Sequence, residues 1–199
     1  MTAAVFLDRD GVIVETVHDA LLGTAESPYR AADVVLAAGA ADAIRALRAH
    51  GFLLVVVSNQ PAAAKGNATL ADLRAVHERT VALLAAQSAD LDDWRYCFHH
   101  PAGSDPALSI SCDCRKPAAG LLLAAAERHG IDLARSWMVG DSDSDVAAGA
   151  AAGTRTVLVE HAGSRHRRRG AVAPTATVAD LRIATSAITG RSRFAADQL

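Results

Sequence analysis

The stretch Val5-Phe6-Leu7-Asp8-Arg9-Asp10-Gly11 places two carboxylates one residue apart, directly after a short apolar run. The run is typical of a buried strand, and Gly11 supplies the backbone freedom for a sharp exit from it. Burying one carboxylate beside another is costly unless a cation or hydrogen bonds offset the charge. Proteins that keep such a pair use it for metal binding, as a nucleophile or for acid–base chemistry. Alone, the pattern also fits a strand that runs into an Asp-rich turn.

The bulk properties predict one domain with a sizeable core. The chain has 199 residues, 51% of them hydrophobic, and a net charge of −2 that gives no general attraction to nucleic acids or anionic membranes. A basic run at 165–169 is typical of a solvated loop, with nucleic-acid binding as the less favoured hypothesis. No apolar stretch approaches membrane-spanning length, and the N-terminus lacks a secretory pattern. We therefore expect a cytoplasmic protein with no membrane or nucleic-acid partner, whose three cysteines are reduced or metal-bound.

Short apolar runs alternate with helical patterns along the chain. The expected strands are 3–7, 52–57, 94–98, 137–139 and 154–159. The expected helices are 39–50, 70–88, a helix from Pro117 in its first turn to about 129, 143–152 and 178–188. This alternation predicts an α/β fold, a parallel sheet with helices on both faces, in a single domain over 1–190. We expect long loops at 17–33 and 99–114, and a frayed tail at 191–199.

The informative polar residues follow the predicted strands at their carboxyl ends. Asp8 and Asp10 end the first strand, Ser58 and Asn59 end the second, and Asp141 ends the fourth. Because ligands of open α/β sheets bind at these ends, we expect the side chains to share one site.

These residues contain the parts that phosphoryl transfer through an aspartate needs. Asp8 can attack phosphorus, and Asp10 can protonate the departing alkoxide and later activate water. Mg²⁺ prefers oxygen ligands, which Asp8, the Asp10 carbonyl and Asp141 could supply. Ser58 can donate a hydrogen bond to a phosphoryl oxygen, and Lys116 can place a positive charge there. For Lys116 the plain alternative is a solvated surface lysine.

A second acidic cluster follows the strand that ends before Asp141. Asp143 is interpreted as a helix-capping residue at a first turn, where its charge also suits the helix dipole. Asp145 could cap the same turn, but we favour a supporting role in which it orients Asp141, Lys116 or a metal-bound water.

Cys97 and His99 are followed by Cys112 and Cys114 at the end of the same predicted loop. Two pairs of such ligands suit tetrahedral Zn²⁺, and together they use every cysteine of the chain. His100 competes with His99 for the fourth position. With four protein ligands, the zinc would be structural and would order the loop.

At this point the sequence resembles the haloacid-dehalogenase-like phosphatases. The resemblance is carried by Asp8-x-Asp10-Gly11, Ser58-Asn59, Lys116 and Gly140-Asp141 with Asp145, in the order of the family and across most of 3–160. It implies a Rossmann-like three-layer α/β/α core, Mg²⁺ dependence and an aspartyl-phosphate intermediate. It also implies that Asp8 is the nucleophile, that Asp10 is the general acid and base, and that Ser58 and Lys116 steady the phosphoryl group.

The segments Cys97-x-His99, Cys112-x-Cys114-Arg115-Lys116-Pro117 and Ser58-Asn59-Gln60 are similar to the heptose-bisphosphate phosphatase and histidinol-phosphatase branch. The resemblance implies a capless, monomeric enzyme in which a zinc loop at 97–114 stands in for a cap domain. It also implies that Asn59, Gln60 and Arg115 bind substrate. The chain departs from the branch at 17–19, at Pro61-Ala62 and at Ser142, positions that bear on the sugar more than on the chemistry.

The resemblance favours a phosphomonoesterase for a small metabolite, with D-glycero-D-manno-heptose 1,7-bisphosphate losing its 7-phosphate. Histidinol phosphate is the alternative, followed by other sugar phosphates. A second phosphate calls for cations such as Arg115 and Lys65, whereas an amine-bearing substrate calls for an acid such as Glu15, Asp19 or Glu26. Less favoured hypotheses are a polynucleotide 3′-phosphatase, which needs a basic channel beside the nucleophile, and a zinc-stabilised binding module without turnover.

Overall fold

The computed structural model describes residues 1–19, 24–170 and 172–190, so the predicted tail at 191–199 lies outside the described residues. Its centre is a six-stranded sheet in which every neighbouring pair of strands is parallel. The strands follow the order β5 (Asp93–Cys97), β4 (Leu53–Asn59), β1 (Ala4–Leu7), β6 (Trp137–Gly140), β7 (Arg155–Val159) and β8 (Ala176–Val178). The predicted α/β class is confirmed.

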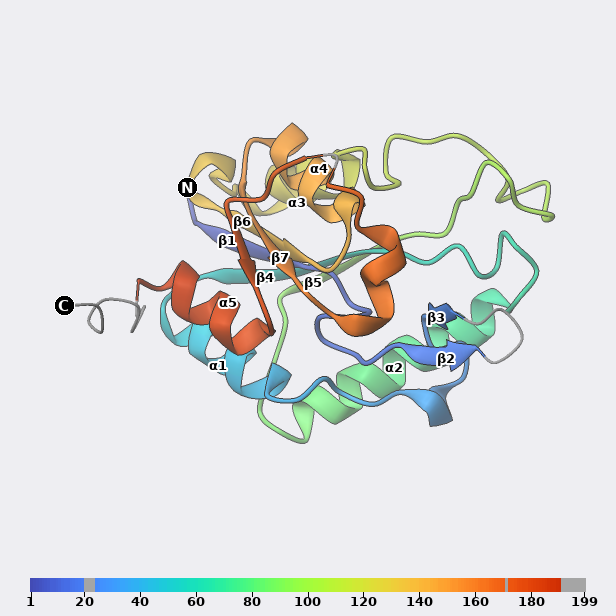
Figure 1. The fold of residues 1–199 in the computed structure, drawn as a ribbon, viewed down its shortest axis with the longest axis horizontal. Coiled ribbons are helices and arrows are strands. Elements are labelled where there is room, and N and C mark those ends of the chain that lie inside the picture. Colours follow the sequence, from blue (N-terminus) through green and yellow to red (C-terminus); the bar gives the residue numbers. More distant parts are fainter. Residues whose placement is uncertain (20–23, 171, 191–199) are drawn as a thin grey trace.

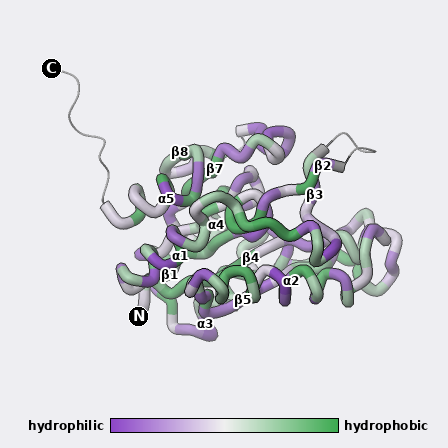
Figure 2. Tube along the Cα trace, turned by 90° about the horizontal axis from the view of Figure 1, so that it is seen from below, coloured by the Kyte–Doolittle hydropathy of each residue, from purple (hydrophilic) through white to green (hydrophobic). Residues whose placement is uncertain are grey.

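Helices cover both faces of this sheet, as Figure 1 shows. One face packs against α1 (Ala40–Ala49), α2 (Leu70–Ala85) and α5 (Leu181–Ile188), and the other against α3 (Gly120–His129) and α4 (Asp143–Ala152). The alternation of side chains along a strand divides β1 between these two cores: Val5 and Leu7 join the first, Ala4 and Phe6 the second. Strands buried on both faces need continuous apolar runs, and hydrophobic stretches accordingly lie in the interior strands in Figure 2.

The segment 17–33, predicted as a loop, instead contains regular structure. Its described residues form an antiparallel pair of β2 (Val17–Asp19) and β3 (Thr24–Glu26), followed by a 3₁₀ turn η1 (Ala31–Asp33). Each strand has three residues, too short to show the period of two that identifies a strand in a sequence. The edge strand β8 was missed for the same reason, and α5 begins at Leu181 rather than at Val178, which belongs to β8.

The predicted position of Pro117 in the first turn of a helix is wrong, because α3 begins at Gly120. The Asn59 side chain fixes the main chain just before the proline: it donates to the Lys116 carbonyl at 2.9 Å and accepts from the Lys116 N–H at 3.0 Å. The Lys116–Pro117 peptide bond is cis. The helix starts three residues after this proline.

The basic run at 165–169 is only partly the solvated loop that we expected. Its first residues close the 3₁₀ helix η3 (Ala162–Arg167), and Arg168 donates to the His161 carbonyl at 2.8 Å and to Ser164 Oγ at 3.1 Å. The main-chain N–H of Arg169 donates to Asp143 Oδ2 at 2.6 Å, while its side chain is exposed. In the part of the chain that the structure describes, no helix has the length and apolar character to cross a membrane.

Candidate active site

The predicted site residues converge at the carboxyl ends of the central strands. Asp8 follows β1, Ser58 lies near the end of β4, Asp141 follows β6, and the loop before α3 brings Lys116 between them. A cavity of about 320 Å³ opens here and is lined by residues from several separate chain segments. These residues are Asp8, Asp10, Glu26, Ser27, Tyr29, Ser58, Asn59, Gln60, Pro61, Ala62, Lys65, Asn67, Arg115, Lys116, Ser142, Ser144, His166 and Arg167.

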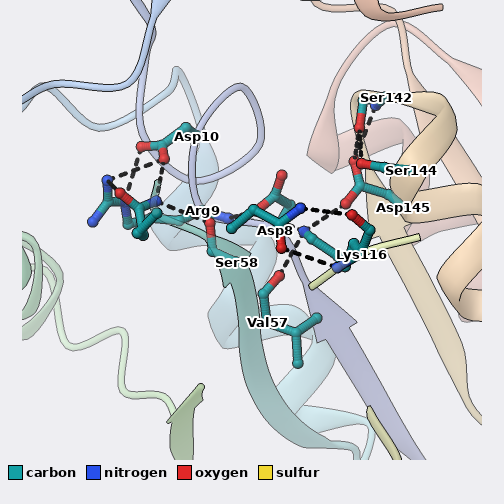
Figure 3. Close-up of polar contacts among 11 residues, drawn as sticks. Asp8, Arg9, Asp10, Val57, Ser58, Lys116, Ser142, Ser144 and Asp145 are labelled. Atoms are coloured by element: carbon teal, nitrogen blue, oxygen red, sulfur yellow. Dashed lines mark hydrogen bonds and ion pairs between the residues drawn. The ribbon is translucent and has the colours of Figure 1, made fainter. Parts of the chain in front are cut away.

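The Lys116 ammonium is the electrostatic centre of the site (Figure 3). Its Nζ lies 3.0 Å from Asp8 Oδ1 and 2.5 Å from Asp145 Oδ1, and it donates to the Val57 carbonyl at 2.7 Å. Burial opposes the charge of Lys116, but the two carboxylates outweigh it and raise the lysine's pKa. Burial raises the pKa of Asp8 to about 6, although Lys116 acts in the opposite direction. Lys116 is thus a buried, permanently charged group rather than a surface lysine.

Asp141 carries a buried oxygen that calls for a cation. Its Oδ2 is buried without a hydrogen-bond partner among the described atoms, and oxygens of Asp8, Asp141 and Asp145 all lie within 4.8 Å of one another. Burial, followed by the charges of Asp8 and Asp145, raises the pKa of Asp141 to about 8. A divalent cation with oxygen ligands removes this repulsion, so the residues fit the predicted metal site.

Gly11 keeps the space around Asp141 open. Its φ of +83° lies in the left-handed region, and a Cβ built on it would lie 2.1 Å from Asp141 Oδ2. The glycine of the opening motif is therefore required twice, by the backbone turn and by the carboxylate that faces it.

The Asp10 carboxylate has different partners from that of Asp8: it is bound by Arg9 and Gln60, whereas Asp8 pairs with Lys116. Its carboxylate accepts from Arg9 Nε at 2.9 Å, from Arg9 Nη2 at 3.0 Å and from Gln60 Nε2 at 2.6 Å (Figure 3 shows the Arg9 bonds). Arg9 is 1% exposed and also donates to Gln60 Oε1 at 2.8 Å. Burial works against the charge of Arg9, but the neighbouring Asp10 outweighs it and raises the pKa of the guanidinium. Both Asp10 oxygens act as acceptors here, so donating a proton requires Asp10 to exchange these partners.

Ser58 and Asn59 contribute in different ways. Ser58 lines the cavity and accepts from Gln60 Nε2 at 3.1 Å, and its hydrogen bond to Asp8 partly counters the rise in that residue's pKa. Asn59 also lines the cavity, but both ends of its amide bind the main chain of Lys116. Its geometry makes Asn59 a positioning residue for Lys116.

The predicted zinc ligands form one cluster beside the site. Cys97 Sγ lies 3.6 Å from Cys112 Sγ and 3.3 Å from Cys114 Sγ, and Cys114 Sγ lies 3.5 Å from His99 Nδ1. Cys112 Sγ lies 3.2 Å from Cys114 Sγ, and Cys97 Sγ lies 3.9 Å from His99 Nδ1. Tetrahedral Zn²⁺ with ordinary bond lengths separates its ligands by about 3.5–3.8 Å, so shifts of a few tenths of an ångström bring the four residues to the geometry of the ion. Burial tends to raise the pKa of Cys112, but hydrogen bonds with Cys114 and His99 outweigh it and lower the pKa to about 7. His99 rather than His100 belongs to the cluster.

The zinc loop also supports the part of the cavity lining that contains Lys65 and Arg115, the two outer cations of the cavity. Arg115 directly follows Cys114 and donates to the His99 carbonyl at 3.2 Å. The carbonyl of Ala64, next to Lys65, accepts from the N–H groups of Ser104 at 2.7 Å and Asp105 at 3.1 Å. Ordering the loop therefore also fixes the chain that presents Lys65 and Arg115 to the cavity.

Several residues of the site were not among the predicted ones. Arg9 could have been suspected, because a charged residue between two acids at the end of an apolar run must find a partner when it is buried. Tyr29, Ser144 and Arg167 reach the cavity from segments that the motifs do not mark. No local signal in the sequence places them there.

Comparison with known proteins identifies the family. A family model described as HAD-hydrolase-like matches residues 113–184. A D-glycero-beta-D-manno-heptose-1,7-bisphosphate 7-phosphatase of Rhodopseudomonas palustris is 40% identical over 150 residues, which cover 75% of this chain and 79% of the relative. The chain belongs to the haloacid-dehalogenase-like phosphatases. A second phosphatase with the same name, from Pseudomonas putida, is 39% identical to this haloacid-dehalogenase-like phosphatase over 88% of the chain and 93% of the relative.

A solved structure resembles this haloacid-dehalogenase-like phosphatase over nearly its whole length. It is D,D-heptose 1,7-bisphosphate phosphatase from B. bronchiseptica complexed with magnesium and phosphate, with a TM-score of 0.79 and 27% identity. The match covers 96% of this chain and 100% of that one.

Proposed function

We propose that this chain is a Mg²⁺-dependent phosphomonoesterase that releases the 7-phosphate of D-glycero-D-manno-heptose 1,7-bisphosphate through an aspartyl-phosphate intermediate. The observation that carries the proposal is the pairing of Asp8 with Lys116, 3.0 Å apart, beside the unpartnered oxygen of Asp141. The names of the relatives support the choice of substrate. We infer that residues 1–190 form a single catalytic domain.

In the first step an Asp8 oxygen attacks phosphorus, and the bond from phosphorus to the ester oxygen of the substrate breaks. Asp10 gives its proton to the departing alkoxide, after exchanging its partners Arg9 and Gln60. In the second step Asp10 takes a proton from water, whose oxygen attacks phosphorus and releases phosphate and free Asp8.

The phosphoryl oxygens are held by groups whose charge does not depend on pH near neutrality. The raised pKa of Lys116 keeps its ammonium charged, and Ser58 lines the cavity beside it. Mg²⁺ bound by Asp8, Asp141 and the Asp10 carbonyl would supply the positive charge that lets an anionic carboxylate approach an anionic phosphate. Asp145 orients Lys116 through its 2.5 Å ion pair, and Zn²⁺ at the cysteine cluster is structural.

A bisphosphate suits the charges around the rest of the cavity. Lys65 and Arg115 line it, and in the described part of the chain neither side chain forms an ion pair with a carboxylate. Two of the three acids that an amine-bearing substrate could use are engaged: Glu26 pairs with Arg167 at 3.3 Å, and Glu15 with His161 at 3.0 Å. The side chain of the third, Asp19, lies outside the described part of the chain. We therefore assign recognition of the second phosphate to Arg115 and Lys65, and infer that Gln60, which also lines the cavity, positions Asp10.

We propose further that the substrate is a small molecule rather than a nucleic acid. In the basic run at 165–169, Arg167 and Arg168 are engaged with a carboxylate and with main-chain carbonyls, so the run supplies no continuous channel of free cations. Action as a cytoplasmic monomer without a membrane partner also stays a proposal. The three cysteines are free and lie together in a group that could hold a metal, which supports a reducing compartment.

The test is phosphate release with Mg²⁺ from heptose 1,7-bisphosphate, heptose 7-phosphate and histidinol phosphate. We expect the highest kcat/KM for the bisphosphate. Arg115→Gln and Lys65→Gln should each reduce its advantage over heptose 7-phosphate, whereas Arg128→Gln, an exposed arginine of α3, should not. Equal kcat/KM for the two heptose substrates in the native enzyme would contradict the proposed recognition of a second phosphate.

A further inference from the structure

Arg9 is a buried charge that takes no direct part in either proposed chemical step. Its side chain is 1% exposed, and Arg9 is not one of the residues that line the cavity. Any effect of Arg9 on the reaction must therefore pass through a neighbour. That neighbour is Asp10, whose carboxylate the guanidinium binds through two N–H groups, Nε to Oδ1 and Nη2 to Oδ2 (Figure 3).

The hydrogen bonds on the Asp10 carboxylate leave one acceptor site open. An ionised carboxylate has about four such sites, shared equally between its oxygens. Oδ2 accepts from Arg9 Nη2 at 3.0 Å and from Gln60 Nε2 at 2.6 Å, which fills its sites. Oδ1 accepts from Arg9 Nε at 2.9 Å and has no second donor among the described residues. Asp10 lines the cavity, so this remaining site on Oδ1 suits a proton that comes from water there.

Arg9 is itself fixed by side chains from two other strands and from α2. Its Cζ lies 5.8 Å from the centroid of the Tyr96 ring, and the Tyr96 hydroxyl hydrogen-bonds the guanidinium. Because arginine has donors only, the Tyr96 oxygen accepts this bond, and its own hydrogen can go to His77 Nδ1, 3.0 Å away. The His77 ring packs edge-on against Tyr96 and Trp94. Gln60 Oε1 accepts from the same guanidinium at 2.8 Å, so the orientation of Arg9 is set on several sides.

We propose that Arg9 is a positioning residue for the second chemical step, in which it fixes the Asp10 carboxylate so that the open site on Oδ1 takes the proton of the attacking water. In that step the water oxygen forms a bond to phosphorus, and the bond from phosphorus to Asp8 breaks. The electron pair of the broken bond returns to the Asp8 carboxylate, and the proton stays on Asp10.

The two steps make different demands on the hydrogen bonds between Arg9 and Asp10. Taking up a proton at the open site breaks none of the bonds that hold ionised Asp10, whereas donating a proton in the first step requires Asp10 to exchange partners. Loss of Arg9 therefore slows the second step more than the first. This inference rests on the proposed function and deepens it, because it assigns Arg9 to one of the two steps.

The experiment measures both steps in the same reaction. Enzyme and Mg²⁺ are mixed rapidly with heptose 1,7-bisphosphate that is radiolabelled in its 7-phosphate, and acid-quenched samples give the labelled protein and the released phosphate over time. Arg9→Gln should slow phosphate release at least about tenfold more than it slows labelling of the protein, which is part of the contribution of a general base. Labelled protein then accumulates during turnover. Arg95→Gln removes a half-buried arginine of β5 that pairs with Asp93 at 2.8 Å, and it should leave the ratio of the two rate constants unchanged.

Two milder variants keep the test decisive if Arg9→Gln does not fold. Arg9→Lys keeps the charge but cannot bind both Asp10 oxygens side-on, and Tyr96→Phe removes only the hydroxyl that bonds Arg9. Both should change the ratio in the same direction by smaller factors. If a folded Arg9→Gln slows both steps by one factor, or if Arg9→Lys and Tyr96→Phe keep the native ratio, Arg9 only supports the fold and the inference is wrong. Phosphate release without labelled protein, in the native enzyme and in every variant, contradicts the proposed aspartyl-phosphate and the inference with it.

Discussion

Replacing Gly11 by alanine tests whether Asp141 holds the catalytic metal, because the new methyl group meets that carboxylate. The added Cβ would lie 2.1 Å from Asp141 Oδ2 and 2.7 Å from its Cγ. To reach an ordinary contact of 3.4 Å, the carboxylate must move by more than 1 Å. A displacement of about 1 Å in a catalytic constellation costs on the order of a hundredfold in rate.

Gly51 provides the matched control, because it has nearly the same positive φ without the clash. Its φ is +80°, compared with +83° at Gly11, and nothing lies within 4 Å of the position that an added Cβ would take. Alanine in this conformation costs about 1–2 kcal/mol of stability at either site. The difference between the two variants therefore isolates the effect on Asp141.

The assay combines urea unfolding, with and without Mg²⁺, and phosphate release. Gly51→Ala should lose about 1–2 kcal/mol of unfolding free energy, and keep both its activity and its stabilisation by Mg²⁺. Gly11→Ala should lose that amount or more, lose the Mg²⁺-dependent stabilisation, and show a kcat lower by roughly a hundredfold. If Gly11→Ala responds to Mg²⁺ as Gly51→Ala does and stays as active, Asp141 is not the ligand that we infer.

Three further predictions concern the nucleophile, the zinc loop and metal binding. Asp8→Asn should lower kcat by at least ~10³-fold while phosphate still raises Tm, and activity close to native would remove Asp8 from its role. Cys112→Ala should lose its zinc by elemental analysis and raise KM for the bisphosphate more than it lowers kcat, because the loop supports the cavity's outer cations; native zinc content and KM would contradict this. The raised pKa values of Asp8 (about 6) and Asp141 (about 8) mean that the folded, metal-free protein holds protons that Mg²⁺ must displace. Stabilisation by Mg²⁺ should therefore grow from pH 6 to pH 8, with the affinity rising up to about tenfold per pH unit for each proton released, and a flat profile would exclude this linkage.

The sequence predicted those elements whose local pattern is strong. The five-residue apolar run in β4 and the capping box of α2, where Thr69 and Asp72 bond each other's main-chain N–H groups, are visible in a short window. The hairpin strands β2 and β3 and the edge strand β8, each of three residues, have no such window and depend on tertiary pairing.

The same distinction applies to the site. The motif residues could be placed together because parallel strands bring their carboxyl ends to one edge of the sheet. The Glu26–Arg167 pair joins positions 141 residues apart, and the sequence around neither residue indicates this contact. The orientation of Asp10 toward Arg9 and Gln60 likewise depends on a side chain from another strand end, which spacing along the chain does not encode.

The stereochemical course of the reaction at phosphorus shows directly whether an aspartyl-phosphate forms on Asp8. A thiophosphate analogue of the substrate, made chiral at phosphorus with two oxygen isotopes, is hydrolysed in the presence of Mg²⁺ in water that carries the third isotope, and the configuration of the released thiophosphate is determined by NMR. Attack by Asp8 followed by attack of water inverts the configuration twice, so we expect overall retention. Inversion would mean a single direct attack by water and would contradict the aspartyl-phosphate on Asp8.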